Sequence, residues 1–527
     1  MKTLTIVIGL DGAGFELIQN WLKEGKLPNL KRMMDEGCSA DLESCLPPVT
    51  SPNWKCYSTG KNPGKLGIFW WENIDLENRK VYFPIDRVNT SKETWDFIGE
   101  NGGRVGIINM PLTYPPKNVN GFLIAGGSFA KEHGYTYPPE LEVELKEAFD
   151  YQVHLRKKHL IGKENEKAVD EALEVIESRF RVAKKLLLEN ALDFLHVTTF
   201  YINALHHNFW DNRYTEEAWK LIDKNIGVLL KEIKNRGNVF IISDHGSNKI
   251  DQVFYINNWL AKEGYLELRS NIKLSNLLYS YGVSRQTLNR LFRKPLLKIF
   301  SPLLRHLVPN KIMGFFPSEA GTIDQSNKTD KINWDKTKAI ASGQGPLYIN
   351  LEGKGKERVR EELIEKLENL RNPKTGKNIA RKVYRKEEIY SGKYLAEAPD
   401  LIIDQNPGTH IRGGIGVGKE DVFMEPRGWK AENKRQGIFI AYGPAIKRGK
   451  RLEKVSILDL APTILHLMNI PIPKDMDGRV LMETFEQESE PAKRKVKYQK
   501  VENYKTEKEK DRIKQIVKSI KQSGRLR

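Results

Sequence analysis

Residues 47–60 read PPVTSPNWKCYSTG and place two adjacent hydroxyl groups, on Thr50 and Ser51, between two prolines. Proline fixes its own φ and biases the preceding residue toward extended geometry, so the backbone here is stiff. The stretch Asn53 to Thr59 is predicted to be helical, with Asn53 or Ser51 as its N-cap. Because a helix N-terminus favours an anion, the stretch predicts a hydroxyl held where a phosphate can bind. Taken alone, it also fits a plain proline-rich turn.

Three apolar segments elsewhere are each followed by polar side chains able to bind a metal. They are Thr3–Ile8 before Asp11, Leu192–Thr199 before Asn203, His206 and His207, and Asn238–Ser243 before Asp244 and His245. Runs rich in β-branched residues predict parallel strands covered on both faces. Ligands bind at the carboxyl ends of such strands, so these polar residues are expected to lie at one edge of a sheet.

Strand and helix patterns alternate along most of the chain. Further strands are predicted at Arg104–Asn109, Phe122–Ala125, Ala339–Asn350, Asp400–Asp404 and Gly437–Gly443, and helices at Phe15–Glu24, Glu216–Asn235, Glu357–Leu370 and Val455–Met468. Such alternation predicts an α/β fold with a doubly wound, mostly parallel sheet.

Composition narrows the class of protein. The 527 residues are 39% hydrophobic and 29% charged, with a net charge of +18 and three cysteines. So few cysteines argue against a secreted disulfide framework, and no apolar run reaches the length of a membrane-spanning helix. The positive charge favours anionic partners. We therefore expect a cytoplasmic protein, with peripheral binding to the inner membrane surface as an option.

One internal segment and the C-terminal end differ from the rest. Arg269–Ser318 contains no Asp or Glu and alternates basic with apolar residues, a pattern of membrane-surface helices and also of an ordinary cap helix with its cations in water. We predict a catalytic domain over 1–485 with a basic helical insert at about 265–330. Residues 486–527 are predicted to be a charged tail, disordered or helical.

Asp11, Asp244 and His245 supply oxygen and imidazole donors at predicted strand ends, and Thr50 adds a fourth donor. Such donors suit a divalent cation, which would activate the hydroxyl and offset charge on a phosphoryl oxygen. Each of these residues could also have a purely structural role. Asp11 could be a helix N-cap, and Asp244 with His245 could form a turn.

Six segments together resemble the alkaline phosphatase superfamily, most closely its type I phosphodiesterase and nucleotide pyrophosphatase branch, over about residues 1–481. They are VIGLDGAG (7–14), LPPVTSPNW (46–54), STGKNPGKLGI (58–68), SDHG (243–246), GIFIAYGPAI (437–446) and DLAPTILHLMNIPIPKDMDG (459–478). The resemblance implies that Thr50 is a nucleophile forming a phospho-enzyme. It also implies that Asp11, Thr50, Asp244 and His245 hold one metal ion, zinc or manganese.

The second metal site of that family is altered in this sequence. Asn203 and Asn433 stand where the family has Asp and His, whereas His207 matches the pattern. Neutral amides are weak ligands, so a second ion is expected to bind poorly. His206 or His410 could substitute, and His207 could equally be a core histidine. The phosphoethanolamine and phosphoglycerol transferases are similar enzymes that work with one metal.

Two hypotheses follow. The first is a metal-dependent hydrolase or transferase acting through Thr50 on a phosphodiester or phosphomonoester, with a phosphorylated small-molecule, lipid-linked or glycan-linked substrate. The alternative is a catalytically degenerate protein of the same fold that binds an anion, lipid or glycan. Neither predicts specific nucleic-acid binding. A sulfatase-type hydrolase is disfavoured because position 50 is not cysteine.

Overall fold

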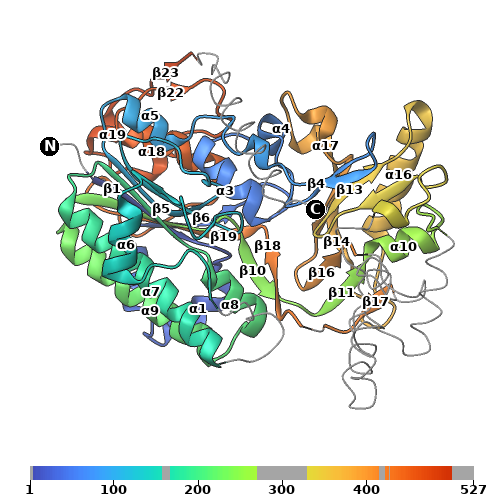
Figure 1. The fold of residues 1–527 in the computed structure, drawn as a ribbon, viewed down its shortest axis with the longest axis horizontal. Helices are drawn as coiled ribbons and strands as arrows, with labels where there is room; N and C mark the ends of the chain where they lie inside the picture. Colours follow the sequence, from blue (N-terminus) through green and yellow to red (C-terminus); the bar gives the residue numbers. More distant parts are fainter. Residues whose placement is uncertain are drawn as a thin grey trace, which may run out of the picture.

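The computed structural model describes residues 4–156, 166–234, 236–269, 329–414, 422–426 and 428–500. Its larger lobe is built on a ten-stranded sheet (Figure 1). Five central strands run parallel, in the order β9 (Gly237–Ile242), β1 (Leu4–Leu10), β8 (Phe194–Thr199), β5 (Val105–Pro111) and β6 (Gly121–Gly126). The predicted mostly parallel α/β sheet is therefore confirmed.

Antiparallel and short strands complete this sheet at its two sides. β19 (Gln436–Tyr442) runs antiparallel to both β9 and β2 (Cys38–Glu43). The outer strands are β20 (Lys450–Arg451), β21 (Val455–Ser456) and β7 (Thr136–Tyr137). The strand predicted at Gly437–Gly443 thus exists, but it belongs to the antiparallel part of the sheet.

Helices cover both faces of the large sheet, as a doubly wound fold requires (Figure 1). On one face α7 (Glu166–Glu189) packs against α9 (Arg213–Ile233), and on the other α3 (Thr50–Thr59), α5 (Thr94–Glu100) and α18 (Leu460–Leu467) contact one another. The remaining helices of this lobe are α1 (Phe15–Lys23), α2 (Pro28–Asp35), α4 (Pro63–Leu66), α6 (Leu141–Phe149) and α8 (Tyr201–Phe209).

A smaller lobe has its own apolar core. Its antiparallel sheet has the order β12 (Ala339–Ala341), β13 (Pro346–Ile349), β15 (Leu401–Gln405) and β14 (Ala380–Arg385). Around it lie α10 (Ile256–Lys262), α16 (Gly353–Asn369), α17 (Lys386–Ile389), β11 (Gln252–Tyr255), β16 (Thr409–Arg412) and β17 (Phe423–Met424). The ribbon β10 (Gly246–Lys249) with β18 (Ala431–Lys434) lies between the lobes, and β3 (Asn73–Asp75) pairs with β4 (Lys80–Tyr82) (Figure 1).

The segment assigned to a tail is ordered in its first part. β23 (Tyr498–Gln499) pairs with β22 (Ile472–Pro473), and α19 (Glu490–Lys493) precedes it. His466 also donates a hydrogen bond from Nε2 to the Pro491 carbonyl, at 2.8 Å. Residues 486–500 are therefore folded onto the larger lobe. The basic residues of the predicted insert, from 270 to 328, and the end of the tail lie outside the described residues. Among the described helices, none has the length and apolarity needed to cross a membrane.

Helix α3 begins at Thr50, three residues earlier than the sequence predicts. The extended residue Val49 is its N-cap, and the proline at position 52 is tolerated because first-turn N–H groups have no partner within the helix. Asn53, predicted as an N-cap, instead donates from Nδ2 to the carbonyls of Pro47 and Val49. The Thr50 hydroxyl therefore stands at the helix N-terminus.

A buried ion cluster fixes the middle of α3. Lys55 and Glu93, each 1% exposed, form an ion pair of 2.7 Å, and Lys117 Nζ lies 2.7 Å from the second oxygen of the same carboxylate. Burial favours the uncharged forms, whereas the two ammonium groups hold the pKa of Glu93 below its usual value. The cluster therefore depends on the charge of Glu93.

We expect Glu93→Gln to destabilise the protein by about 3 kcal/mol, because it leaves the buried Lys55 ammonium group without its carboxylate partner, whereas Lys117 keeps its pair with Asp96. The measurement is urea unfolding of the full chain. Glu77→Gln is the matched control because Glu77 is exposed. Equal midpoints for the two variants would show that the ion cluster does not hold α3 in place.

Candidate metal and nucleophile site

Four side chains from three distant segments meet at the carboxyl edge of the parallel sheet. Asp11 follows β1, Asp244 and His245 follow the neighbouring strand β9, and Thr50 begins α3. The ligand atoms of Asp11, Asp244 and His245 all lie within 4.8 Å of one another. Thr50 Oγ1 is 3.3 Å from Asp11 Oδ1 and 3.3 Å from His245 Nε2. The structure therefore brings the four predicted residues together.

The protonation of His245 shows that this cluster fits a cation. His245 Nδ1 donates to the Gly246 carbonyl at 2.9 Å, which leaves Nε2 with its lone pair. The Nε2 atom lies 3.2 Å from Asp244 Oδ2 and 3.8 Å from Asp11 Oδ1. Asp244 Oδ2 is buried without a hydrogen-bond partner. Three electron-pair donors thus face one another, with the Thr50 hydroxyl beside two of them, an arrangement that a divalent cation satisfies.

The two carboxylates are costly to bury in their charged forms. Burial, reinforced by the nearby charge of Asp244, raises the pKa of Asp11 to about 8. Burial likewise raises the pKa of Asp244 to about 7, although hydrogen bonds such as that from the Gly12 amide, 3.1 Å from Oδ1, oppose the shift. Burial lowers the pKa of His245. Without a cation, the site therefore favours neutral side chains near pH 7.

Two residues that the sequence analysis did not single out lie close to Asp11 and shape this part of the site. Trp54 Nε1 donates to Asp11 Oδ2 at 2.9 Å. Gly12 has φ +68°, and a Cβ there would lie 2.3 Å from Asn203 Oδ1, so only glycine fits this turn. Residues four apart on a helix share a face, and Trp54 follows Thr50 by four, but this signal was missed because the predicted helix began at Asn53 and excluded Thr50.

The three residues expected at a second metal site lie beside the first one. Asn203, on α8, donates from Nδ2 to Asp11 Oδ1 at 2.8 Å, and its Oδ1 atom is buried without a partner. His207 Nδ1 donates to the Ala431 carbonyl at 2.8 Å, leaving Nε2 as an acceptor. Asn433 Oδ1 is also buried without a partner. These groups offer neutral acceptors and no carboxylate, so they suit hydrogen-bond donors better than a second cation.

The two histidines considered as substitutes differ in position. His206 is fully buried and accepts a hydrogen bond from Trp219 Nε1 at 3.0 Å, so it belongs to the core. His410 lines the cavity above Thr50 and pairs through Nδ1 with Glu432. Glu432 accepts a further hydrogen bond from Gln344 Nε2, at 2.6 Å. His410 and Gln344, joined through Glu432, thus form a polar wall of the cavity that the sequence analysis did not predict.

A cavity of about 630 Å³ lies over Thr50, between the two lobes. Thr50, Asn203, His207 and Asn433 line it, whereas Asp11, Asp244 and His245 do not appear in its wall. The other lining side chains are chiefly aromatic or polar: Trp70, Trp71, Phe200, Trp429, Gln344, His410 and Arg412. His207 stacks on Trp429 with ring centroids 4.0 Å apart. Thr50 is therefore the member of the metal set that a bound molecule can reach.

A donor set of this kind at the carboxyl edge of an α/β sheet is typical of hydrolases that use a divalent cation. The model of the family described as type I phosphodiesterase / nucleotide pyrophosphatase matches residues 5–430. The chain belongs to this family, within the alkaline phosphatase superfamily. Membership supports a phosphoryl hydrolase of the phosphodiesterase or pyrophosphatase type, and such enzymes typically depend on divalent metals.

Among solved structures, the chain is similar to the murine ectonucleotide pyrophosphatase / phosphodiesterase 5. The identity is 14%, the TM-score is 0.48, and the match covers 92% of this chain and 100% of that chain. The sequence matches no curated protein.

Proposed function

We propose that the protein cleaves or transfers phosphate esters with Thr50 as nucleophile and one divalent cation held by Asp11, Asp244, His245 and Thr50. The observation that carries the proposal is the meeting of these four side chains beneath a cavity that exposes only the hydroxyl. The cation, when bound, favours the alkoxide form of Thr50 and offsets negative charge on the phosphoryl group.

The protein's own residues supply the rest of the reaction. Thr50 Oγ1 forms a bond to phosphorus while one ester oxygen leaves, and the hydroxyl proton goes to the leaving group or to water. A monoester gives phosphothreonine, and a diester gives phosphothreonine that keeps the second ester group. Water or another hydroxyl compound then takes the phosphoryl group and restores the Thr50 hydroxyl. The N-terminus of α3 favours negative charge beside Thr50. Trp54 and Asn203 donate hydrogen bonds to Asp11 and hold its carboxylate facing the hydroxyl.

The cavity favours a substrate with an apolar or aromatic part next to its phosphate. Trp70, Trp71, Phe200 and Trp429 supply flat apolar surface, and Arg412 supplies a positive charge. Nucleotides combine these features and match the substrates that the family suggests. Lipid-linked and glycan-linked phosphates share the phosphate and remain candidates for the same cavity.

We expect one zinc or manganese ion per chain, because the acceptors at Asn203, His207 and Asn433 include no anionic ligand. The measurement is elemental analysis of protein dialysed against each metal, together with hydrolysis of bis(4-nitrophenyl) phosphate. Two ions would mean that the amides coordinate metal after all. No ion and no turnover would favour the alternative hypothesis, a binding protein of the same fold.

A further inference from the structure

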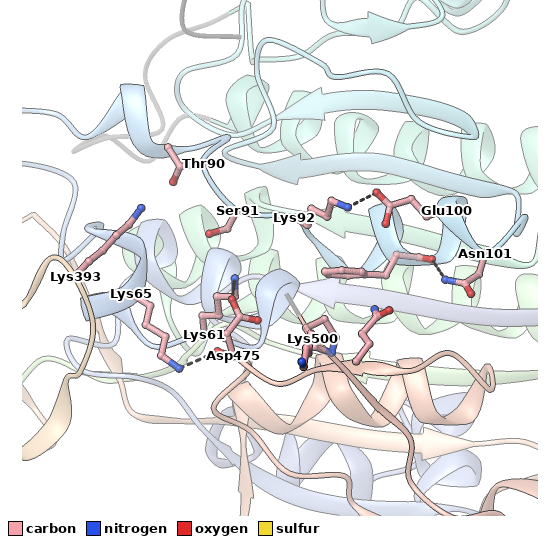
Figure 2. Close-up of a pocket in the computed structure, with 13 residues that line it drawn as sticks. Lys61, Lys65, Thr90, Ser91, Lys92, Glu100, Asn101, Lys393, Asp475 and Lys500 are labelled. Carbon is pink, nitrogen blue, oxygen red and sulfur yellow. Dashed lines mark hydrogen bonds and ion pairs between the residues drawn. The ribbon is translucent and has the colours of Figure 1, made fainter. Parts of the chain in front are cut away.

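A second cavity, of about 520 Å³, lies past the C-terminal end of α3, whereas the catalytic cavity lies at the N-terminal end, and this second cavity is lined by lysines (Figure 2). Its residues come from five separate segments of the chain. They are Lys61, Lys65, Thr90, Ser91, Lys92, Phe97, Glu100, Asn101, Lys393, Pro473, Asp475, Gln499 and Lys500. Residues so far apart in sequence converge on one opening, so no local run of basic residues accounts for this concentration of charge.

Positive charge exceeds negative charge in this lining. Five lysines face two carboxylates, Glu100 and Asp475, which leaves a formal charge of +3. Lys61 pairs with Asp475 and Lys92 with Glu100, each at 2.5 Å. Lys65 pairs with Asp477 from outside the lining, which reduces the excess to two.

Lys393 and Lys500 carry the remaining charge. Neither has a carboxylate partner among the described residues, and both are exposed. Lys393 Nζ lies 4.7 Å from the centroid of the Tyr394 ring, a contact that leaves its hydrogen-bond donors free for a ligand. Like charges gathered at one cavity repel one another, so an anion bound in that cavity is favoured.

The lysine cavity and the catalytic cavity share no residue. Thr50 begins α3 and lines the catalytic cavity, whereas Lys61 follows the end of α3 at Thr59 and lines the lysine cavity. A helix of ten residues is about 15 Å long, so a ligand bound at one cavity does not reach the other.

We propose that the lysine cavity is a second anion-binding site, which takes a small phosphate compound carrying at least two negative charges. Lysine ammonium groups bind phosphate as point charges, and Ser91 and Gln499 add polar groups suited to phosphate oxygens or ligand hydroxyls. The volume suits a small organic phosphate. The phosphate belongs either to a free metabolite or to a lipid headgroup, and the proposal does not depend on catalysis by Thr50.

The test is isothermal titration calorimetry of the full chain with inorganic pyrophosphate, after metal has been stripped and the chelator dialysed away. Removing metal weakens competing binding at the Thr50 site. We compare Lys393→Gln/Lys500→Gln with the control Lys262→Gln/Lys354→Gln, which removes the same charge from exposed lysines outside both cavities. We expect one pyrophosphate per chain and about tenfold weaker binding in the cavity variant only.

Failure of pyrophosphate to bind, or equal weakening in both double variants, would overturn the proposal. A second arm measures binding to phosphatidylcholine vesicles with and without phosphatidylglycerol. Vesicle binding that pyrophosphate displaces, and that the cavity variant loses, identifies a lipid headgroup as the source of the phosphate. If the cavity variant loses pyrophosphate binding but binds vesicles as well as the parent protein does, the phosphate belongs to a free compound.

Discussion

Thr50→Ala is expected to lower kcat for an aryl phosphodiester by at least about 10³-fold while leaving the fold intact. The reason is chemical, since alanine removes the only oxygen of the candidate metal set that lines the cavity. Asp11, Asp244 and His245 remain, so metal binding should weaken much less than turnover.

Two further variants separate a nucleophile from a structural hydroxyl. Thr50→Ser restores an oxygen at the same place and should recover part of the activity, whereas Ser51→Ala removes the adjacent hydroxyl of α3 and should turn over normally. Acid quenching during turnover should trap the covalent intermediate at Thr50. This is an aryl ester of phosphothreonine, because a phosphodiester keeps its second ester group, and peptide mass spectrometry detects it. Undiminished turnover by Thr50→Ala would exclude the proposed nucleophile.

The candidate metal set was predictable because its signals are local. Asp11, Asp244 and His245 each follow a short apolar run that only a buried strand explains, and parallel strands end at a common edge. No long-range packing is needed to recognise that pattern. The positions of Thr50 and its proline neighbours likewise predicted a stiff, hydroxyl-bearing turn, although the helix starts earlier than the capping preferences suggested.

The rest depends on contacts between distant segments. The hydrogen bonds that Glu432 accepts from His410 Nδ1 and Gln344 Nε2 join β18 to two segments of the smaller lobe, and no periodicity of the sequence encodes these contacts. The ordered part of the tail depends on a few anchors. The charged composition of residues 486–500 gave no sign that Tyr498–Gln499 pairs with β22. The lysine cavity was hidden in the same way, because its five lysines are scattered over the sequence.

Asp244→Asn is expected to abolish metal binding and turnover and, at the same time, to stabilise the metal-free protein at pH 8 by about 3 kcal/mol. An asparagine at position 244 keeps the acceptor for the Gly12 amide. Its Nδ2 would stand where Oδ2 now lies, 3.2 Å from the lone pair of His245 Nε2, and donate to it. Two groups that repel in the absence of a cation would thereby become a hydrogen-bonded pair.

The pH dependence gives this prediction its sign. The folded pKa of Asp244 is about 7, above its ordinary value, so between about pH 4 and pH 7 the native state keeps a proton that the unfolded chain has released. Because the native state binds more protons than the unfolded chain in this range, the free energy of unfolding of the metal-free protein falls as the pH rises. Asp244→Asn removes one such group, so the stability of the variant should fall less steeply with pH, and added zinc should stabilise the parent protein but not the variant.

Thermal unfolding from pH 5 to pH 8 measures both effects, with Asp335→Asn as the control because its carboxylate is 81% exposed. A variant that melts below the metal-free parent at pH 8 would show that the Asp244 carboxylate is stabilised by something other than a cation.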